Sequence, residues 1–167
     1  MTCSEYLKDW LVERGHDASR IGVVKLGIEI DAFSPVEEQT RADAKRARFD
    51  VAPETVVVTF VGRLDPQKRP YLVPLIANAL AALVGDQKFL IVMLGDGYLW
   101  PGVMERVEQY ALDGLVRVLG TVTRPQDYLV ATDIFLLPSV SEGISIAVAE
   151  AMAMALPVVT AHAGALP

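Results

Sequence analysis

Short apolar runs alternate with longer helical patterns through most of this 167-residue chain, and this alternation constrains the fold more than any other feature. Residues 55–61 are dense in β-branched side chains, and residues 88–94 form a second such run that stops at a Gly-Asp-Gly turn. Nearly continuous apolar strands separated by helices are typical of a parallel sheet covered on both faces. Right-handed crossovers then give a Rossmann-like, doubly wound α/β fold. The expected strands are 55–61, 88–94, 116–119, 133–137 and 156–160, with helices over 70–84, 101–112, 126–132 and 145–154.

Composition restricts the partners that such a chain can take. It is 52% hydrophobic and 22% charged, which suits one domain with a sizeable core. The net charge of −6 repels nucleic acid and anionic lipid. One cysteine, Cys3, and two distant histidines leave neither a disulfide framework nor a metal site to expect. No apolar run approaches the roughly 20 residues that span a bilayer, so we expect a soluble, cytoplasmic, metal-independent protein.

The two ends of the chain differ from its middle. Residues 23–26 predict a strand, and residues 37–50 predict a charged, mobile helix or linker, most simply a solvated one. Residues 163–167 follow the last expected strand directly, with no closing helix after it. We therefore expect a fragment that begins in the tail of an earlier unit.

The loop after the first strong strand carries three cations, Arg63, Lys68 and Arg69, just before a helix begins. In open parallel sheets, ligands bind beyond the carboxyl ends of the strands. Cations beside the positive end of a helix dipole form a site for a diphosphate. A basic surface loop with no ligand remains the simpler alternative.

The second strong strand ends in Gly95-Asp96-Gly97-Tyr98, and the next glycine is Gly102. This spacing does not fit the dinucleotide fingerprint, and no Walker A lysine follows it, which disfavours NAD and ATP. The turn either lines a nucleotide pocket or is simply tight.

Two carboxylates follow the strand that ends at residue 137. Glu142 precedes Gly143 at the start of a helix, and Glu150 lies inside that helix among apolar neighbours, where a carboxylate needs a partner. Glycine lets backbone N–H groups approach an anion closely. Two carboxylates alone would also suit a glycoside hydrolase, or only a helix cap and a surface glutamate. Combined with phosphate-binding cations, they favour a nucleotide-sugar donor.

Taken together, these segments resemble the C-terminal half of the large retaining GT-B glycosyltransferase family, which includes glycogen synthases, sucrose synthases and bacterial cell-envelope glycosyltransferases. The matching segments are Gly62-Arg63-Leu64 with Lys68, Gly95-Asp96-Gly97, the E-x7-E motif from Glu142 to Glu150, Pro157-Val158-Val159, and the upstream residues 27–35. The resemblance covers nearly the whole chain. It implies that residues 1–50 are an interdomain crossover or tail and that residues 51–167 are a nucleotide-sugar-binding domain, truncated at its C-terminus.

The resemblance also implies a role for each site residue. Arg63 and Lys68 would clamp the donor diphosphate and stabilise the charge that builds on it. Glu142 would hold donor-sugar hydroxyls, and Glu150 the ribose hydroxyls. Retention would follow from front-face attack, with the leaving phosphate helping to deprotonate the acceptor, and no cofactor or metal is required. The remaining substrate-binding residues would be Gly143, Ile144 and Ser145 at the phosphate, and Gly95, Gly97, Thr121 and Val122 at the base.

Three residues depart from the family pattern: Leu26 replaces Asn, Ser145 replaces Gly or Pro, and Ala155 replaces Gly where a positive φ is usual. The acceptor-binding N-terminal domain and the closing C-terminal helices are missing, so we expect an isolated domain that does not turn over. Its exposed apolar surface favours self-association. Contact of the complete protein with a membrane surface stays open, as do the sugar, the base and the acceptor. The alternatives are a nucleotide-sugar epimerase of GT-B fold, a non-catalytic nucleotide-sugar-binding module, and an unrelated Rossmann or flavodoxin-like protein.

Overall fold

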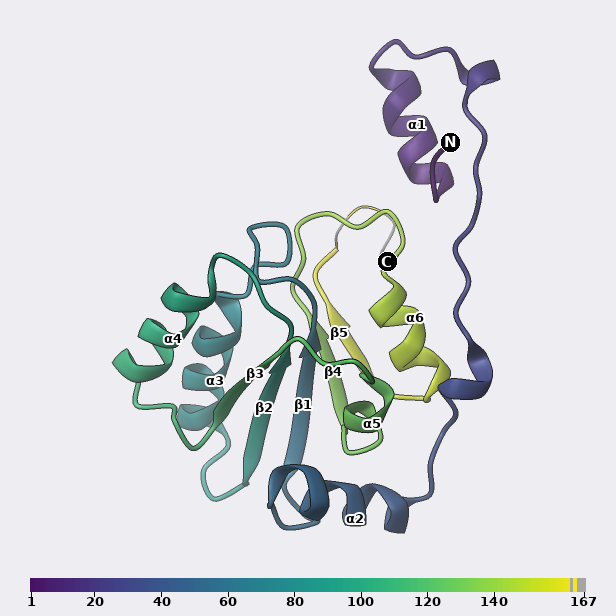
Figure 1. Ribbon diagram of the computed structural model, residues 1–167. Coiled ribbons are helices and arrows are strands. Elements are labelled where there is room, and N and C mark those ends of the chain that lie inside the picture. The colour runs from purple at the N-terminus through teal and green to yellow at the C-terminus, as the bar shows by residue number, and fades with distance from the viewer. Residues whose placement is uncertain (163, 165–167) are drawn as a thin grey trace.

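The computed structural model describes residues 1–162 and Gly164. Its centre is one sheet of five parallel strands in the order β3-β2-β1-β4-β5 (Figure 1). All five expected strands are present, so the prediction of a Rossmann-like, doubly wound α/β fold is confirmed. The strands are β1 (Val56–Val61), β2 (Phe89–Leu94), β3 (Val116–Gly120), β4 (Ile134–Leu137) and β5 (Val158–Thr160).

Four helices connect these strands: α3 (Leu72–Leu83), α4 (Trp100–Gln109), α5 (Gln126–Leu129) and α6 (Ile146–Ala153). Helix α3 begins two residues later than expected from Pro70. Pro74 is then its third residue, where a backbone N–H has no partner within the helix. The helix therefore tolerates this proline in its first turn.

Strands β1 and β4 are neighbours, although 72 residues of the sequence lie between the end of β1 and the start of β4. From β1 the chain continues through α3 to β2, on one side of the sheet order, and from β4 it continues through α6 to β5, on the other. This is the point where the strand order reverses, and ligands of doubly wound sheets bind outside the carboxyl ends of the strands at such a point. The loops that follow β1 and β4 are therefore the first place to look for a site.

The central strands bury both faces, as their continuous apolar sequences require. On one face, Phe60 and Ile91 belong to the larger core cluster, together with Val73 of α3 and Val103 of α4. Residues in alternate positions point to the other face, where a smaller cluster contains Val57, Leu90, Val92 and Phe49. Burial on both faces fixes the register of the strands, since a one-residue slip would exchange the two sets.

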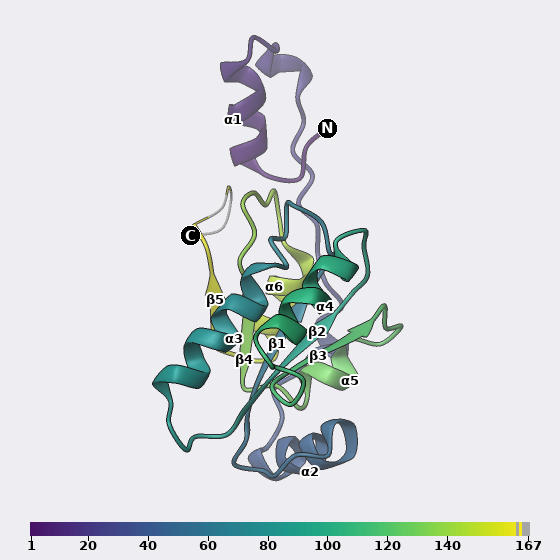
Figure 2. The same cartoon turned by 90° about the vertical axis from the view of Figure 1, so that its left-hand side faces the viewer.

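Residues 1–29 lie apart from the sheet and contain α1 (Glu5–Glu13), whose N-cap Ser4 accepts a hydrogen bond from the Leu7 amide. Figures 1 and 2 show α1 beyond the carboxyl ends of the strands. The expected strand over 23–26 is wrong: Val23 forms only an isolated parallel bridge with Thr2. A strand needs continued pairing along a neighbour, and here that neighbour is a single residue. The chain returns to the domain at Phe33, which is buried in the larger core cluster.

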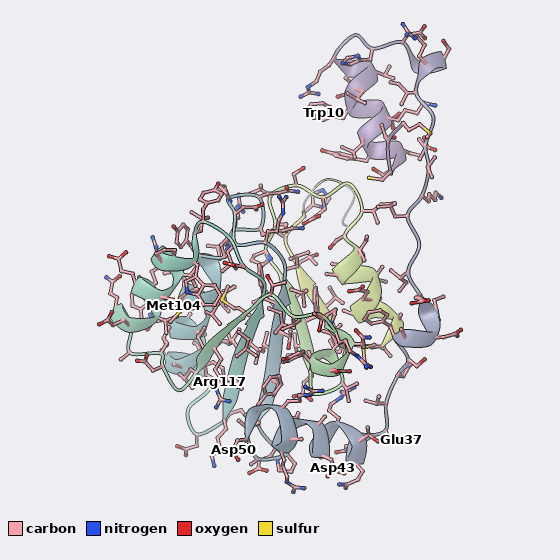
Figure 3. The ribbon with its side chains drawn as sticks, viewed as in Figure 1. Trp10, Glu37, Asp43, Asp50, Met104 and Arg117 are labelled. Carbon is pink, nitrogen blue, oxygen red and sulfur yellow. The ribbon has the colours of Figure 1, made fainter. Side chains whose placement is uncertain are left out.

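Helix α2 (Glu38–Phe49) is anchored, contrary to the mobile helix or linker that its charged sequence suggested. Its last residue, Phe49, is 1% exposed and packs in the smaller cluster. Arg117 on β3 points toward this end of the helix (Figure 3) and donates a hydrogen bond to the Phe49 carbonyl. One apolar residue at the helix end thus fixes an otherwise polar helix below the sheet.

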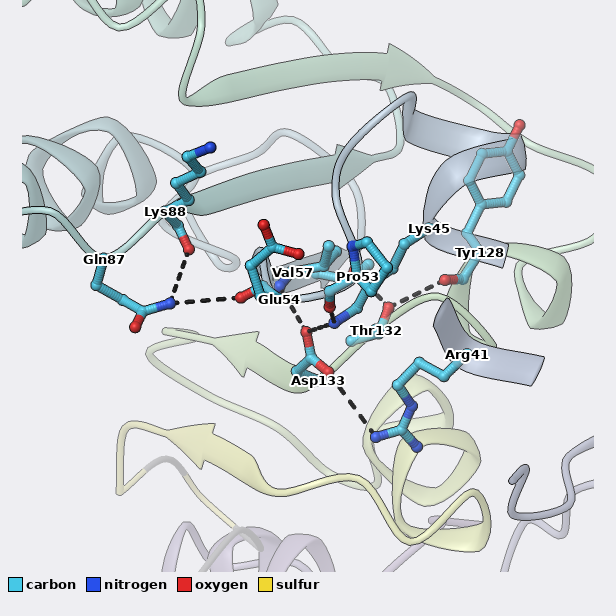
Figure 4. A network of polar contacts seen from close by, with 11 residues as sticks. Arg41, Lys45, Pro53, Glu54, Val57, Gln87, Lys88, Tyr128, Thr132 and Asp133 are labelled. Atoms are coloured by element: carbon cyan, nitrogen blue, oxygen red, sulfur yellow. Dashed lines mark hydrogen bonds and ion pairs between the residues drawn. The ribbon is translucent and has the colours of Figure 1, made fainter. Parts of the chain in front are cut away.

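A buried ion pair fixes the middle of the same helix (Figure 4). Lys45 Nζ lies 2.7 Å from Asp133 Oδ2, and it also donates to the Pro53 carbonyl at 3.0 Å. The same Asp133 oxygen accepts a hydrogen bond from the Val57 amide at 2.7 Å. Asp133, which directly precedes β4, therefore connects that strand to α2 and to the amino end of β1. A cavity of about 590 Å³ adjoins the pair of Lys45 and Asp133.

Every helix in the described part of the chain is too short or too polar to cross a membrane.

Ala155 has a φ of +54°, as its place in the family pattern led us to expect. It follows α6 in a Schellman turn, in which the Ala155 amide donates to Met152 and the Leu156 amide donates to Ala151. We expect Ala155→Gly to raise the free energy of unfolding by about 0.5–1 kcal/mol, because glycine adopts this conformation without a Cβ clash. Chemical denaturation measures the change. Ala153→Gly, at the last residue of α6, is the control and should lower stability by up to about 1 kcal/mol, because this residue keeps a helical backbone. Equal losses for the two variants would contradict the prediction.

Candidate functional site

The loops after β1 and β4 meet at the reversal point of the sheet. Lys68, from the first loop, places its Nζ 2.6 Å from Oε1 of Glu142 in the second. Both side chains are largely withdrawn from solvent, with 16% of Lys68 and 5% of Glu142 exposed. Gln67 connects the same two loops. Its side-chain amide donates to the Ser141 carbonyl at 2.8 Å, and its backbone carbonyl accepts a hydrogen bond from the Val140 amide at 2.9 Å. Two predicted site residues, 74 positions apart, are thus brought into contact.

The other cations of the first loop are less constrained. The Arg63 side chain is 75% exposed, and its Nη2 lies 3.3 Å from Oδ2 of Asp65. Such an exposed ion pair contributes little to stability, so the guanidinium is available to a ligand. Asp65 also accepts a hydrogen bond from the Lys68 amide at 3.1 Å, which shapes the loop between the two cations. Arg69 is exposed and has a φ of +49°, an uncommon conformation for a non-glycine residue.

The start of α6 presents backbone donors. Ser145 is the N-cap, and its side chain accepts a hydrogen bond from the Val148 amide. Within the described residues, the Ile144 and Ser145 amides have no hydrogen-bond acceptor. Gly143 precedes them in a crowded position, where an added Cβ would lie 2.5 Å from Cδ1 of Leu7 and 2.8 Å from Sγ of Cys3. The beginning of α1 therefore packs directly on the Glu142 loop.

Glu150 lies on α6, half-buried. Burial raises the pKa of its carboxyl above the ordinary value, since loss of hydration disfavours the charged form. A carboxylate in such a place gains most from a ligand that donates hydrogen bonds, such as a hydroxyl.

A cavity of about 230 Å³ lies beyond the ends of β1, β2 and β3. Gly95, Thr121 and Val122, three of the residues expected to face a base, line it together with Arg63. Gly97 is not among the lining residues, and its place is structural: an added Cβ would lie 2.5 Å from the Leu64 carbonyl oxygen. The cavity lining also includes the apolar strand-end residues Val61 and Leu94, and Asp96 adds a carboxylate beside the Arg63 cation.

Three residues near the ion pair were given no role from the sequence. Gln67 joins the two loops, and Asp65 contacts both the Arg63 side chain and the Lys68 amide. Ser139 is fully buried, and its hydroxyl has no hydrogen-bond partner in the described part of the structure. Their positions beside motif residues were the available signal, but the contacts of Gln67 depend on the pairing of β1 with β4. Metal ligands are not clustered anywhere in the described residues.

The sequence and fold match known proteins. Residues 55–167 match the model of the family described as Glycosyl transferases group 1. The D-inositol 3-phosphate glycosyltransferase of Mycolicibacterium smegmatis is 34% identical over 155 residues, which cover 90% of this chain and 34% of that protein. The protein of the same name from Kineococcus radiotolerans is 32% identical over 164 residues, with 91% and 36% covered. The chain thus spans about a third of the length of these curated relatives.

The fold is shared with solved structures of low sequence identity. Anabaena HepE, solved in complex with UDP-glucose, superposes with a TM-score of 0.81 at 21% identity, covering 98% of this chain and 44% of that one. Staphylococcus aureus TarM, solved with UDP among its ligands, gives a TM-score of 0.79 at 21% identity, with 97% and 29% covered. These similarities support the expected GT-B half at the level of fold.

Proposed function

The chain belongs to the group 1 glycosyltransferase family, and from this premise we propose that residues 51–167 are the donor-binding domain of a retaining glycosyltransferase. The domain would bind a nucleotide-diphosphate sugar, whose hexose the complete protein transfers to an acceptor. Residues 1–50 would be the crossover from a preceding domain. The observation that carries the proposal is the meeting of Lys68 and Glu142 at the reversal point of the sheet, with Arg63 and the start of α6 beside them.

The chemistry of the site residues suits this substrate. The diphosphate would lie between the Arg63 and Lys68 cations and the amides of Ile144 and Ser145, because fixed donors at a helix start favour an anion. Glu142 and Glu150 would accept hydrogen bonds from sugar and ribose hydroxyls, respectively. The base would occupy the cavity lined by Gly95, Thr121 and Val122.

The same groups would also act during transfer. As the bond between the sugar and the diphosphate breaks, negative charge builds on the leaving oxygens. Arg63 and Lys68 would stabilise that charge, which lowers the barrier in so far as they bind the leaving group more strongly than the intact donor. The leaving phosphate would accept the proton of the attacking hydroxyl, so that attack and departure occur on one face of the sugar and its configuration is retained.

The acceptor is proposed to bind outside the 167 residues, since the chain spans about a third of its relatives' length. The 167-residue chain by itself would then bind a donor without transferring its sugar, as a binding module does. A turnover assay on this chain and on a protein with a preceding acceptor domain distinguishes a domain that only binds the donor from one that also transfers the sugar. Transfer by the isolated chain would contradict this part of the proposal.

We expect the chain to bind one of UDP, GDP or ADP in calorimetric titration. Lys68→Ala and Arg63→Ala should each weaken that binding by about tenfold to a hundredfold, because each removes a charge-assisted hydrogen bond to phosphate. Arg46→Ala is the matched control: Arg46 is an exposed cation on α2, and its loss should leave the affinity unchanged. A folded chain that binds none of the three nucleotides would count against the proposed function.

A further inference from the structure

Both cations proposed to hold the diphosphate are paired with carboxylates in the ligand-free structure. Arg63 faces Asp65 across 3.3 Å, but this guanidinium is mostly in water, so the pair is easily broken. Lys68 and Glu142 differ, since their 2.6 Å contact is largely shielded from solvent. A partly buried ammonium that loses its carboxylate needs an equally good partner.

We propose that Glu142 competes with the diphosphate for Lys68, and that this competition makes the site release its nucleotide product; the inference rests on the proposed function. A donor that still carries its sugar offers Glu142 hydroxyl groups in exchange for the ammonium it gives up. After transfer, the nucleoside diphosphate offers Glu142 nothing. The carboxylate then takes Lys68 back, and the product loses one of its cations.

The contacts around Glu142 hold its backbone in place, so the exchange of partners takes place by movement of side chains. Gln67 holds the two loops together through both of its hydrogen bonds to residues 140 and 141. Gly143 packs closely against the Leu7 side chain. On another side, a Cβ added to Gly164 would lie 2.4 Å from the Glu142 carbonyl oxygen. The backbone around Glu142 is therefore confined from two directions. Lys68, on a flexible four-carbon stem, is the group free to move between carboxylate and phosphate.

The test compares the affinities of the nucleoside diphosphate and of the matching nucleotide sugar in Glu142→Gln. Glutamine keeps the shape of the side chain but cannot form the ion pair. We expect the diphosphate that binds the unmodified chain, whichever of UDP, GDP or ADP it is, to bind the variant about fivefold to tenfold tighter. The nucleotide sugar should gain less or lose affinity, so that the preference for donor over product falls.

Two further variants identify the cause. In a Lys68→Gln background, the tightening by Glu142→Gln should shrink to about twofold or less, because no ammonium remains to compete for. Glu150→Gln, which removes the other carboxylate of the motif, should not tighten diphosphate binding. Thermal unfolding of each variant checks that it is folded.

The outcomes separate the two proposals. If the unmodified chain binds a diphosphate and Glu142→Gln binds it no tighter, competition is wrong while the donor site stands. Tightening that persists in full without Lys68 would also overturn the inference, because it would arise from charge repulsion alone. If the folded, unmodified chain binds no diphosphate, both proposals fail.

Discussion

Replacing Gly95 with alanine is expected to lower the free energy of unfolding by about 4 kcal/mol or more. Single substitutions cause so large a loss only through mechanisms such as backbone strain or steric overlap. Gly95 has a φ of +139°, and an added Cβ would lie 1.9 Å from the carbonyl oxygen of Gly62. Its amide also donates to the Gly120 carbonyl at 2.7 Å, so the residue is fixed between the ends of three strands. The backbone cannot yield without separating β2 from its neighbours.

Differential scanning calorimetry measures this effect. At about 2–4 °C per kcal/mol for a chain of this size, the midpoint should fall by at least about 8 °C. Gly114→Ala is the matched control, because no atom lies within 4 Å of its added Cβ and its φ lies outside the positive region. That variant should stay within about 0.5 kcal/mol of the original. Similar midpoints for the two variants would show that the strand ends are not packed as described.

Asp133→Ala is expected to cost about 3–5 kcal/mol of stability, because it leaves a buried charge without its partner. The Lys45 side chain is 7% exposed and would retain only the Pro53 carbonyl as an acceptor. The Val57 amide would lose its acceptor in the same substitution. Urea denaturation gives the change in the free energy of unfolding.

Two controls interpret the result. Asp43→Ala removes an exposed aspartate of α2 whose pair with Arg46 is open to solvent, and it should cost less than about 0.5 kcal/mol. Lys45→Met combined with Asp133→Asn removes both charges while the asparagine oxygen can still accept from Val57. We expect this double variant to be more stable than Asp133→Ala. If it is less stable, the loss arises from packing and not from the unpaired ammonium.

Much of the fold was predictable from the sequence because its signals are local. Residues 55–61 and 88–94 are continuous apolar runs, and a buried parallel strand requires such a run whatever surrounds it. In these two runs the residues themselves restrict the backbone. The positive φ of Ala155 was expected for another reason, since the family pattern places a glycine at this turn.

Contacts between distant segments were not predictable in the same way. The 2.6 Å approach of Lys68 to Glu142 depends on β1 lying next to β4, which no local pattern specifies. Helix α1 was missed although Leu7 and Leu11 recur at helical spacing, because the segment is short and none of its residues is buried. The anchoring of α2 by Phe49 and Lys45 was missed because a single apolar residue in a charged helix carries little weight in the sequence.

The placement of ion pairs at both ends of β1 and β4 bears on how this protein can change over generations. Asp133 and Lys45 work at the amino ends, and Lys68 and Glu142 at the carboxyl ends. The six residues of β1 separate these pairs by roughly 20 Å, at about 3.3 Å per residue, well beyond the 7–10 Å within which substitutions usually interact. Replacements in the loops after β1 and β4 can therefore alter what is bound, while the pair of Lys45 and Asp133 keeps the chain folded. If these loops bind a donor as proposed, a lineage can exchange that donor without first acquiring a compensating stabilising substitution.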